Sequence, residues 1–150
     1  YLSFKKLGKT PVNLPVSHKE VKNVLVLLPL EDPYMDAALT LIRHLRQYFN
    51  KWHFMALDVR KISPEQQDRF GLPDAEFLKE LQKNEFQLVI DLNFKHDLRI
   101  KYLIGMLAIP HRLHLTFSDA NTYNLFTLTR EENFSGFHHV FTYLKSSFEV

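Results

Sequence analysis

The two stretches that decide the fold are residues 24–49, VLVLLPLEDPYMDAALTLIRHLRQYF, and residues 86–115, FQLVIDLNFKHDLRIKYLIGMLAIPHRLHL. Each contains a continuous apolar run of strand length, of the kind that is buried on both faces of a parallel sheet. Each then passes through a polar loop into a segment whose apolar residues recur at helical spacing. This repeated order of strand and helix predicts right-handed crossovers between parallel strands, as in a Rossmann-like α/β domain.

The rest of the chain continues the alternation. Further strands are predicted at residues 52–59 and 112–116, with a short extended piece at residues 123–128. Three more helices are predicted from their N-terminal signals, which are the capping box Ser63-Pro64-Glu65-Gln66, the cap Asp74 and the turn at Ser135. The sequence thus predicts one domain, an open parallel sheet with helices on both faces.

Composition is that of an ordinary globular domain. A chain of 150 residues is long enough to bury one sizeable core, and no apolar run approaches the roughly 18 residues of a membrane span. The absence of cysteine excludes a disulfide framework and a thiolate zinc site.

The charge of the first residues differs from that of the rest. We divide the chain into an extended basic arm, residues 1–21, and a domain, residues 22–150. The arm is either a solvated tail or a segment that grips a partner subunit or an anionic surface. The domain is slightly acidic, which argues against a general nucleic-acid binder. The first 22 residues hold Lys5, Lys6, Lys9, Lys19 and Lys22 against a single acid, Glu20.

Ligands of open parallel sheets bind at the carboxyl ends of the strands, which here are followed by loops 29–34 and 93–96. The second loop is basic: Lys95, His96 and Arg99 surround the start of a helix, where a phosphate or carboxylate can bind. The alternative is a solvated helix face to which Asp97 supplies the negative charge. Neither loop has a glycine-rich phosphate-binding pattern, so no nucleotide cofactor is predicted.

Other catalytic patterns are weaker. Asp32 and Asp36, with Glu31, form an acidic cluster that suits a general base or a cation site, although turn and cap roles explain it as well. His111 and His114 are three residues apart in a predicted strand and therefore point to opposite faces. The neighbours His138 and His139 also diverge on their helix, so no metal site is predicted.

These residues resemble the N-terminal, acceptor-binding domain of family 9 glycosyltransferases, the heptosyltransferases of lipopolysaccharide assembly. The ending Leu45-Arg46-Gln47-Tyr48-Phe49 matches the family's first helix. The strand Gln87-Leu88-Val89-Ile90-Asp91-Leu92 and the turn Ile109-Pro110-His111-Arg112 match its later motifs. The resemblance covers about residues 22–148 and implies one half of a GT-B fold.

The chain departs from this family where the family keeps its catalytic loop. Pro33 and Tyr34 stand where the family has Gly and a catalytic Asp, and Leu39-Thr40 replaces a Leu-Pro pair. Tyrosine is a poor general base near neutral pH, because its ordinary pKa is about 10. A shift in loop register would bring Asp32 or Asp36 into place. The chain also ends where the family's donor-binding domain begins.

Two functions follow from the resemblance and its departures. The first is a stand-alone, non-catalytic glycosyltransferase-like domain, a binding and assembly module that self-associates or grips a partner protein through its arm. The second is the acceptor half of a glycosyltransferase that transfers sugar from a nucleotide-sugar once a missing donor domain completes it. In both, the expected ligand is an anionic glycan or a phosphate, and the expected place is the bacterial cytoplasm, in one variant at the inner membrane.

Overall fold

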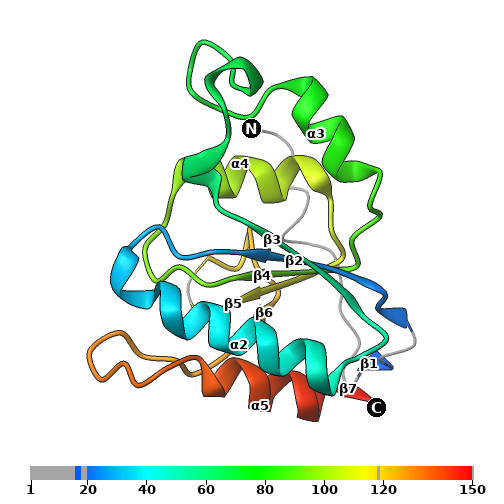
Figure 1. The fold of residues 1–150 in the computed structure, drawn as a ribbon, viewed down its shortest axis with the longest axis vertical. Helices are drawn as coiled ribbons and strands as arrows, with labels where there is room; N and C mark the ends of the chain where they lie inside the picture. Colours follow the sequence, from blue (N-terminus) through cyan, green and yellow to red (C-terminus); the bar gives the residue numbers. More distant parts are fainter. Residues whose placement is uncertain (1–15, 18–19, 118, 150) are drawn as a thin grey trace.

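The computed structural model describes residues 16–17, 20–117 and 119–149. It contains a five-stranded parallel sheet (Figure 1), which confirms the predicted Rossmann-like α/β class. The strand order is β3-β2-β4-β5-β6, and every neighbouring pair is parallel. The strands are β2 (Asn23–Leu27), β3 (His53–Leu57), β4 (Leu88–Asp91), β5 (His111–His114) and β6 (Leu125–Phe126).

Helices cover both faces of this sheet. In Figure 1, α2 (Met35–Tyr48) and α5 (His138–Ser147) lie on one side, and α3 (Ala75–Gln82) and α4 (Leu98–Leu107) lie on the other. β2 contributes to both layers, because Val24 and Val26 belong to the core beneath α2 and α5, while Leu25 and Leu27 belong to the core beneath α3 and α4. The continuous apolar run is therefore explained by burial on both faces.

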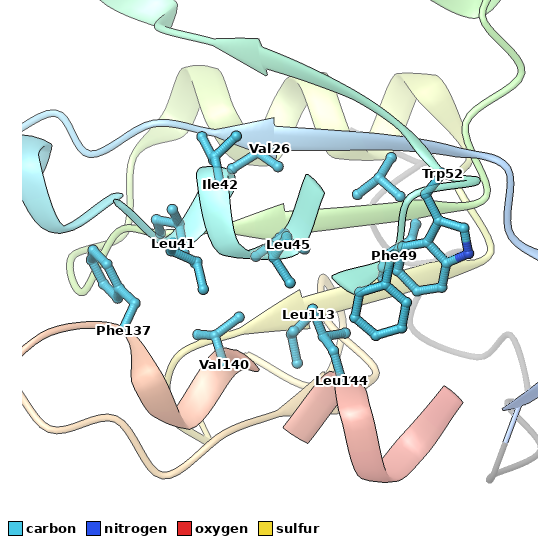
Figure 2. Packing of buried hydrophobic residues seen from close by; sticks show 14 of the residues in the cluster. Val26, Leu41, Ile42, Leu45, Phe49, Trp52, Leu113, Phe137, Val140 and Leu144 are labelled. Carbon is cyan, nitrogen blue, oxygen red and sulfur yellow. The ribbon is translucent and has the colours of Figure 1, made fainter. Parts of the chain in front are cut away.

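The core beneath α2 and α5 is rich in aromatic rings at one end. Figure 2 shows Leu41, Ile42 and Leu45 of α2 pointing toward the sheet and toward the α5 side chains. Phe49, just after α2, stacks on Trp52 with ring centroids 4.0 Å apart. The two rings thus pack against each other across the turn between α2 and β3.

Two of the predicted helix starts have different outcomes. Asp74 caps α3, since its carboxylate accepts a hydrogen bond from the Phe77 backbone N–H at 2.8 Å. The predicted capping box at Ser63 is wrong: its hydroxyl donates to the Gln66 side chain at 3.3 Å and accepts no backbone N–H. The helix there is a single 3₁₀ turn, Pro64–Gln66. Two further 3₁₀ turns are Asp32–Tyr34 and Val59–Lys61.

Part of the predicted basic arm is described. Val16–Ser17 forms β1, which pairs in parallel with β7 (Phe148–Glu149) near the end of the chain. Val21 is buried in the core beneath α2 and α5. Residues 1–15, 18 and 19 of the arm lie outside the described residues. Within the described part of the chain, no helix has both the length and the apolar character that crossing a membrane requires.

Candidate functional site

The carboxyl edge of the sheet brings two predicted loops together. The strand order reverses at β2, whose neighbours are β3 and β4, so the loops after β2 and β4 leave the sheet at the point where ligands of such folds bind. Asn93 joins the two loops. Its side-chain oxygen accepts from the Leu30 N–H at 2.8 Å, and its side-chain nitrogen donates to the Leu28 carbonyl at 3.1 Å.

Asp91, the last residue of β4, anchors Asn93 from inside the protein. The carboxylate is fully buried and accepts from the Asn93 backbone N–H at 3.1 Å and from its side-chain nitrogen at 2.9 Å. Its second oxygen accepts from the Tyr123 hydroxyl. Burial raises the pKa of Asp91, although the charge of His114 and these hydrogen bonds act in the opposite direction. Burial and the adjacent Asp91 likewise raise the pKa of Tyr123.

His114, at the end of β5, extends this buried group toward the solvent. Its Nε2 lies 2.6 Å from the Asn93 carbonyl oxygen, and its Nδ1 lies 3.2 Å from that of Thr116. Its ring stacks on Tyr123 on one side and on His96 on the other, with centroids 4.4 and 6.0 Å apart. Desolvation, followed by the charge of Lys101, lowers the pKa of His96. The edge is thus fixed by a connected polar network.

Tyr34, in the loop after β2, packs among aromatic rings at this edge. Its ring meets those of Phe94 and Phe134 edge to face, with centroids 5.3 and 4.8 Å apart. Its hydroxyl donates to a Glu131 carboxylate oxygen at 2.9 Å. This hydrogen bond is the largest cause that raises the pKa of Tyr34, which moves the phenol further from use as a base.

The acidic candidates nearby have different surroundings. Asp32 is exposed and forms an ion pair with Arg60 at 2.9 Å, and Arg60 also binds Asp58 at 2.9 Å. Asp36 lies exposed in the first turn of α2. Glu31 pairs with Lys95 across the two loops at 3.4 Å. Of these carboxylates, Asp36 is the one for which no ion pair is found among the described residues.

The predicted anion-binding residues share one loop and the start of α4. Asp97 caps this helix by accepting from the backbone N–H groups of Arg99 and Ile100 at 2.9 and 3.2 Å. The Arg99 guanidinium also lies 3.4 Å from that carboxylate. Lys95 and His96 are both exposed. An anion here therefore meets Lys95 and His96 more readily than Arg99, and the anion site stays a prediction.

The loop after β6 adds a third part that the sequence analysis did not single out. Phe94, Thr116, Arg130, Glu131 and Glu132 line a cavity of about 580 Å³ at the carboxyl edge. The buried Thr127 and Thr129 support this loop: their hydroxyls lie 2.9 Å apart, and Thr127 donates to the Leu115 carbonyl at 2.6 Å. The polar run that follows the last strand was the available signal, since every carboxyl end of a parallel sheet meets the same edge.

Two pairs of described histidines were candidates for metal ligands. His111 contacts Phe148 in one core and His114 contacts Tyr123 in the other, so their predicted opposite orientation is confirmed. His138 and His139, predicted to diverge, have rings 4.2 Å apart. In the described ranges, no cluster of three or more metal-ligating side chains occurs.

Comparison of this chain with models of protein families, with curated proteins and with solved structures found no match.

Proposed function

We propose that this chain is a glycosyltransferase-like domain that binds an anionic glycan without transferring it, and that it works as part of an assembly. The observation that carries the proposal is the cavity at the carboxyl edge, whose wall includes Glu131, the hydrogen-bond partner of Tyr34. At the position that corresponds to the catalytic Asp, the side chain thus supports a binding surface.

The cavity lining suits a sugar that carries a negative charge. The Phe94 ring offers an apolar face, while the Thr116 hydroxyl and the Glu132 carboxylate offer hydrogen-bonding partners for sugar hydroxyls. Arg130 supplies a cation in the same lining, and Lys95 and His96 follow Phe94 in its loop. Arginine binds phosphate and carboxylate through two parallel donors. We therefore expect Arg130 to bind the phosphate of a sugar phosphate, beside the two carboxylates Glu131 and Glu132 of the same lining.

Calorimetric titration tests this proposal. We expect a monosaccharide phosphate to bind, its neutral parent sugar to bind more weakly, and inorganic phosphate alone to bind more weakly than the sugar phosphate. Arg130→Ala is expected to weaken binding about tenfold, which corresponds to one charge-assisted hydrogen bond. Lys83→Ala removes an exposed cation that directly follows α3, outside this cavity, and serves as the control. Equal binding by the Arg130 and Lys83 variants would refute the site.

The alternative, an acceptor half of a sugar-transferring enzyme, is favoured by one observation: Asp32 is 87% exposed in the loop after β2. Release from Arg60 would free this carboxylate to act as a base. Transfer from a nucleotide-sugar that Asp32→Asn abolishes, while glycan binding persists, would establish this function instead. The resemblance also implies a bacterial, cytoplasmic protein, at the inner membrane in one variant, which cell fractionation tests.

A further inference from the structure

Phe70 is an exposed aromatic ring held on a well-fixed loop. Its side chain is 73% exposed at the tip of residues 67–73, whose ends pair as an antiparallel bridge. The Asp68 carboxylate accepts from the Phe70 N–H at 2.8 Å, and Gly71 completes the turn at a φ of 77°. The Arg69 guanidinium lies 4.9 Å from the centre of the ring. A ring that is fixed in place before binding loses little conformational entropy when it is buried.

A pocket on the other side of the sheet has the size and character for such a ring. It lies between α2 and α5 and has a volume of about 320 Å³. Its apolar walls include the buried Leu41 and Phe137 and the half-buried Phe141. Thr40 and His44 of α2 also line it and are exposed. An apolar pocket with a polar rim is the usual receptor for an aromatic anchor at a protein interface.

The charges around the ring and around the pocket are complementary. α2 and α5 carry Arg43, Arg46 and Lys145 against one acid, Asp36, and no carboxylate of the described residues pairs with these cations. Lys145 lies over the Phe141 ring, which is part of the pocket wall, at 5.3 Å.

The surface beside the Phe70 loop is acidic by comparison. The hollow there is lined by four carboxylates and two lysines, and one lysine, Lys83, is already paired with Glu80 at 2.8 Å. Asp74 is occupied as the cap of α3, which leaves Glu65 and Glu76 exposed. Arg69, the cation beside the ring, is balanced by its neighbour Asp68, so Glu65 and Glu76 are the groups expected to attract the cations of α2 and α5 in another copy.

We propose that Phe70 of one copy inserts into the pocket between α2 and α5 of the next copy. The segment that leads into α3 and the pair α2 and α5 lie on opposite sides of the sheet (Figure 1), so one chain cannot bring ring and pocket together. The contact uses two different surfaces, so a pair of copies keeps one free ring and one free pocket, to which further copies add head to tail. This contact would be the interface of the proposed assembly, and the inference rests on that part of the proposed function.

Sedimentation velocity over a range of concentrations tests the contact. We expect the full chain to form species that grow with concentration. Phe70→Ala is expected to weaken association more than about tenfold, as for an aromatic anchor at an interface centre. Thr40→Trp, which fills the pocket mouth, is expected to do the same. The controls are Phe117→Ala, a ring 78% exposed elsewhere, and Thr142→Trp, an exposed site of α5 that does not line the pocket.

Mixing the two defective variants gives the decisive result. The Phe70→Ala chain keeps its pocket and the Thr40→Trp chain keeps its ring, so the mixture is expected to form a heterodimer and nothing larger. Should either variant misfold, Lys145→Glu and Glu76→Lys are expected to weaken association singly and to restore it when combined in one chain. A wild-type chain that stays monomeric, a Phe70→Ala chain that associates like the wild type, or a mixture that stays monomeric overturns the proposal.

Glycan binding separates this inference from the proposed ligand. Neither Phe70 nor Thr40 lines the cavity at the carboxyl edge. Loss of association with unchanged binding of the sugar phosphate supports the contact by itself, whereas absence of sugar binding in a chain that still associates removes only the proposed ligand. A separate prediction is that the basic arm contributes to association, which should weaken in the same measurement on a chain without residues 1–20.

Discussion

Replacing Tyr123 by Phe isolates the hydrogen bond that the buried Asp91 receives from a tyrosine hydroxyl. The change keeps the ring, which stacks on His114 with centroids 4.4 Å apart, and removes only the oxygen. Asp91 keeps its two bonds from Asn93, but one carboxylate oxygen loses its donor inside the protein. A hydrogen bond to a charged group contributes about 1.5–3 kcal/mol, so the variant should lose about 2 kcal/mol of unfolding free energy.

The pH dependence of this loss follows from the protonation of Asp91. Burial raises the pKa of Asp91 in the folded protein above its value in the unfolded chain. This raised pKa stabilises the fold at pH values below the unfolded pKa. The stabilisation is lost as the pH rises through the pKa of the folded protein. Removal of the Tyr123 hydroxyl raises the pKa of Asp91 further, because the hydroxyl stabilises the carboxylate form. The difference between Phe and Tyr at position 123 should therefore be largest where Asp91 is ionised and should shrink as the pH falls.

Urea unfolding at several pH values measures both effects. In thermal unfolding, a loss of about 2 kcal/mol in a domain of this size would appear as a decrease of about 4–8 °C in Tm. Tyr48→Phe is the matched control, since its ring lies partly exposed on α2 and its hydroxyl has no hydrogen-bond partner among the described residues. A Tyr123→Phe variant within about 0.5 kcal/mol of the wild type at neutral pH, or one with an equal loss at every pH, would refute the reasoning.

Four further substitutions test other contacts of the structure. Asn93→Ala removes the side chain that joins the loops after β2 and β4, and chemical denaturation should show a loss of about 3 kcal/mol because several partners lose their bonds. Asp74→Ala should cost about 1 kcal/mol of unfolding free energy as a lost helix cap, whereas Ser63→Ala should change it by less than about 0.5 kcal/mol. Burial alone would raise the pKa of Asp119, but its hydrogen bonds, first that with Lys101, lower it to about 2. A lowered pKa stabilises the fold above the unfolded value, near 3.8, and this stability is lost as the pH falls toward 2. Lys101→Met should therefore be less stable than the wild type at neutral pH and differ little from it near pH 2, as acid-unfolding curves will show.

The fold was predictable wherever burial leaves a pattern in the chain. β2 and β4 were clear because their residues are buried on both faces. β3 is shorter than predicted, His53–Leu57 against residues 52–59, because it is an edge strand whose side chains are partly exposed and whose ends carry no strong signal. Asp74 was predictable as a cap because the carboxylate reaches a backbone N–H three residues away.

The parts of the site that could be predicted are the loops that directly follow a clearly marked strand. The loops after β2 and β4 follow from the apolar runs before them, whereas the loop that holds Arg130 follows β6, a strand of two residues. The partners of Asp91 were beyond reach, because Tyr123 lies 32 positions further along the chain. A carboxylate at a strand end looks the same in sequence whether it faces the solvent or a buried tyrosine.

Three carboxylates at this edge already have hydrogen-bond or ion-pair partners. A general base must be free to take up a proton from its substrate. Here Asp91 is buried against Tyr123, Glu131 accepts from Tyr34, and Asp32 is paired with Arg60. Each of these acceptors already has a donor or a cation, and for Asp91 and Glu131 that donor is a tyrosine fixed by ring contacts. Recruiting Asp91 or Glu131 as a base would therefore require breaking the hydrogen bond from Tyr123 or from Tyr34.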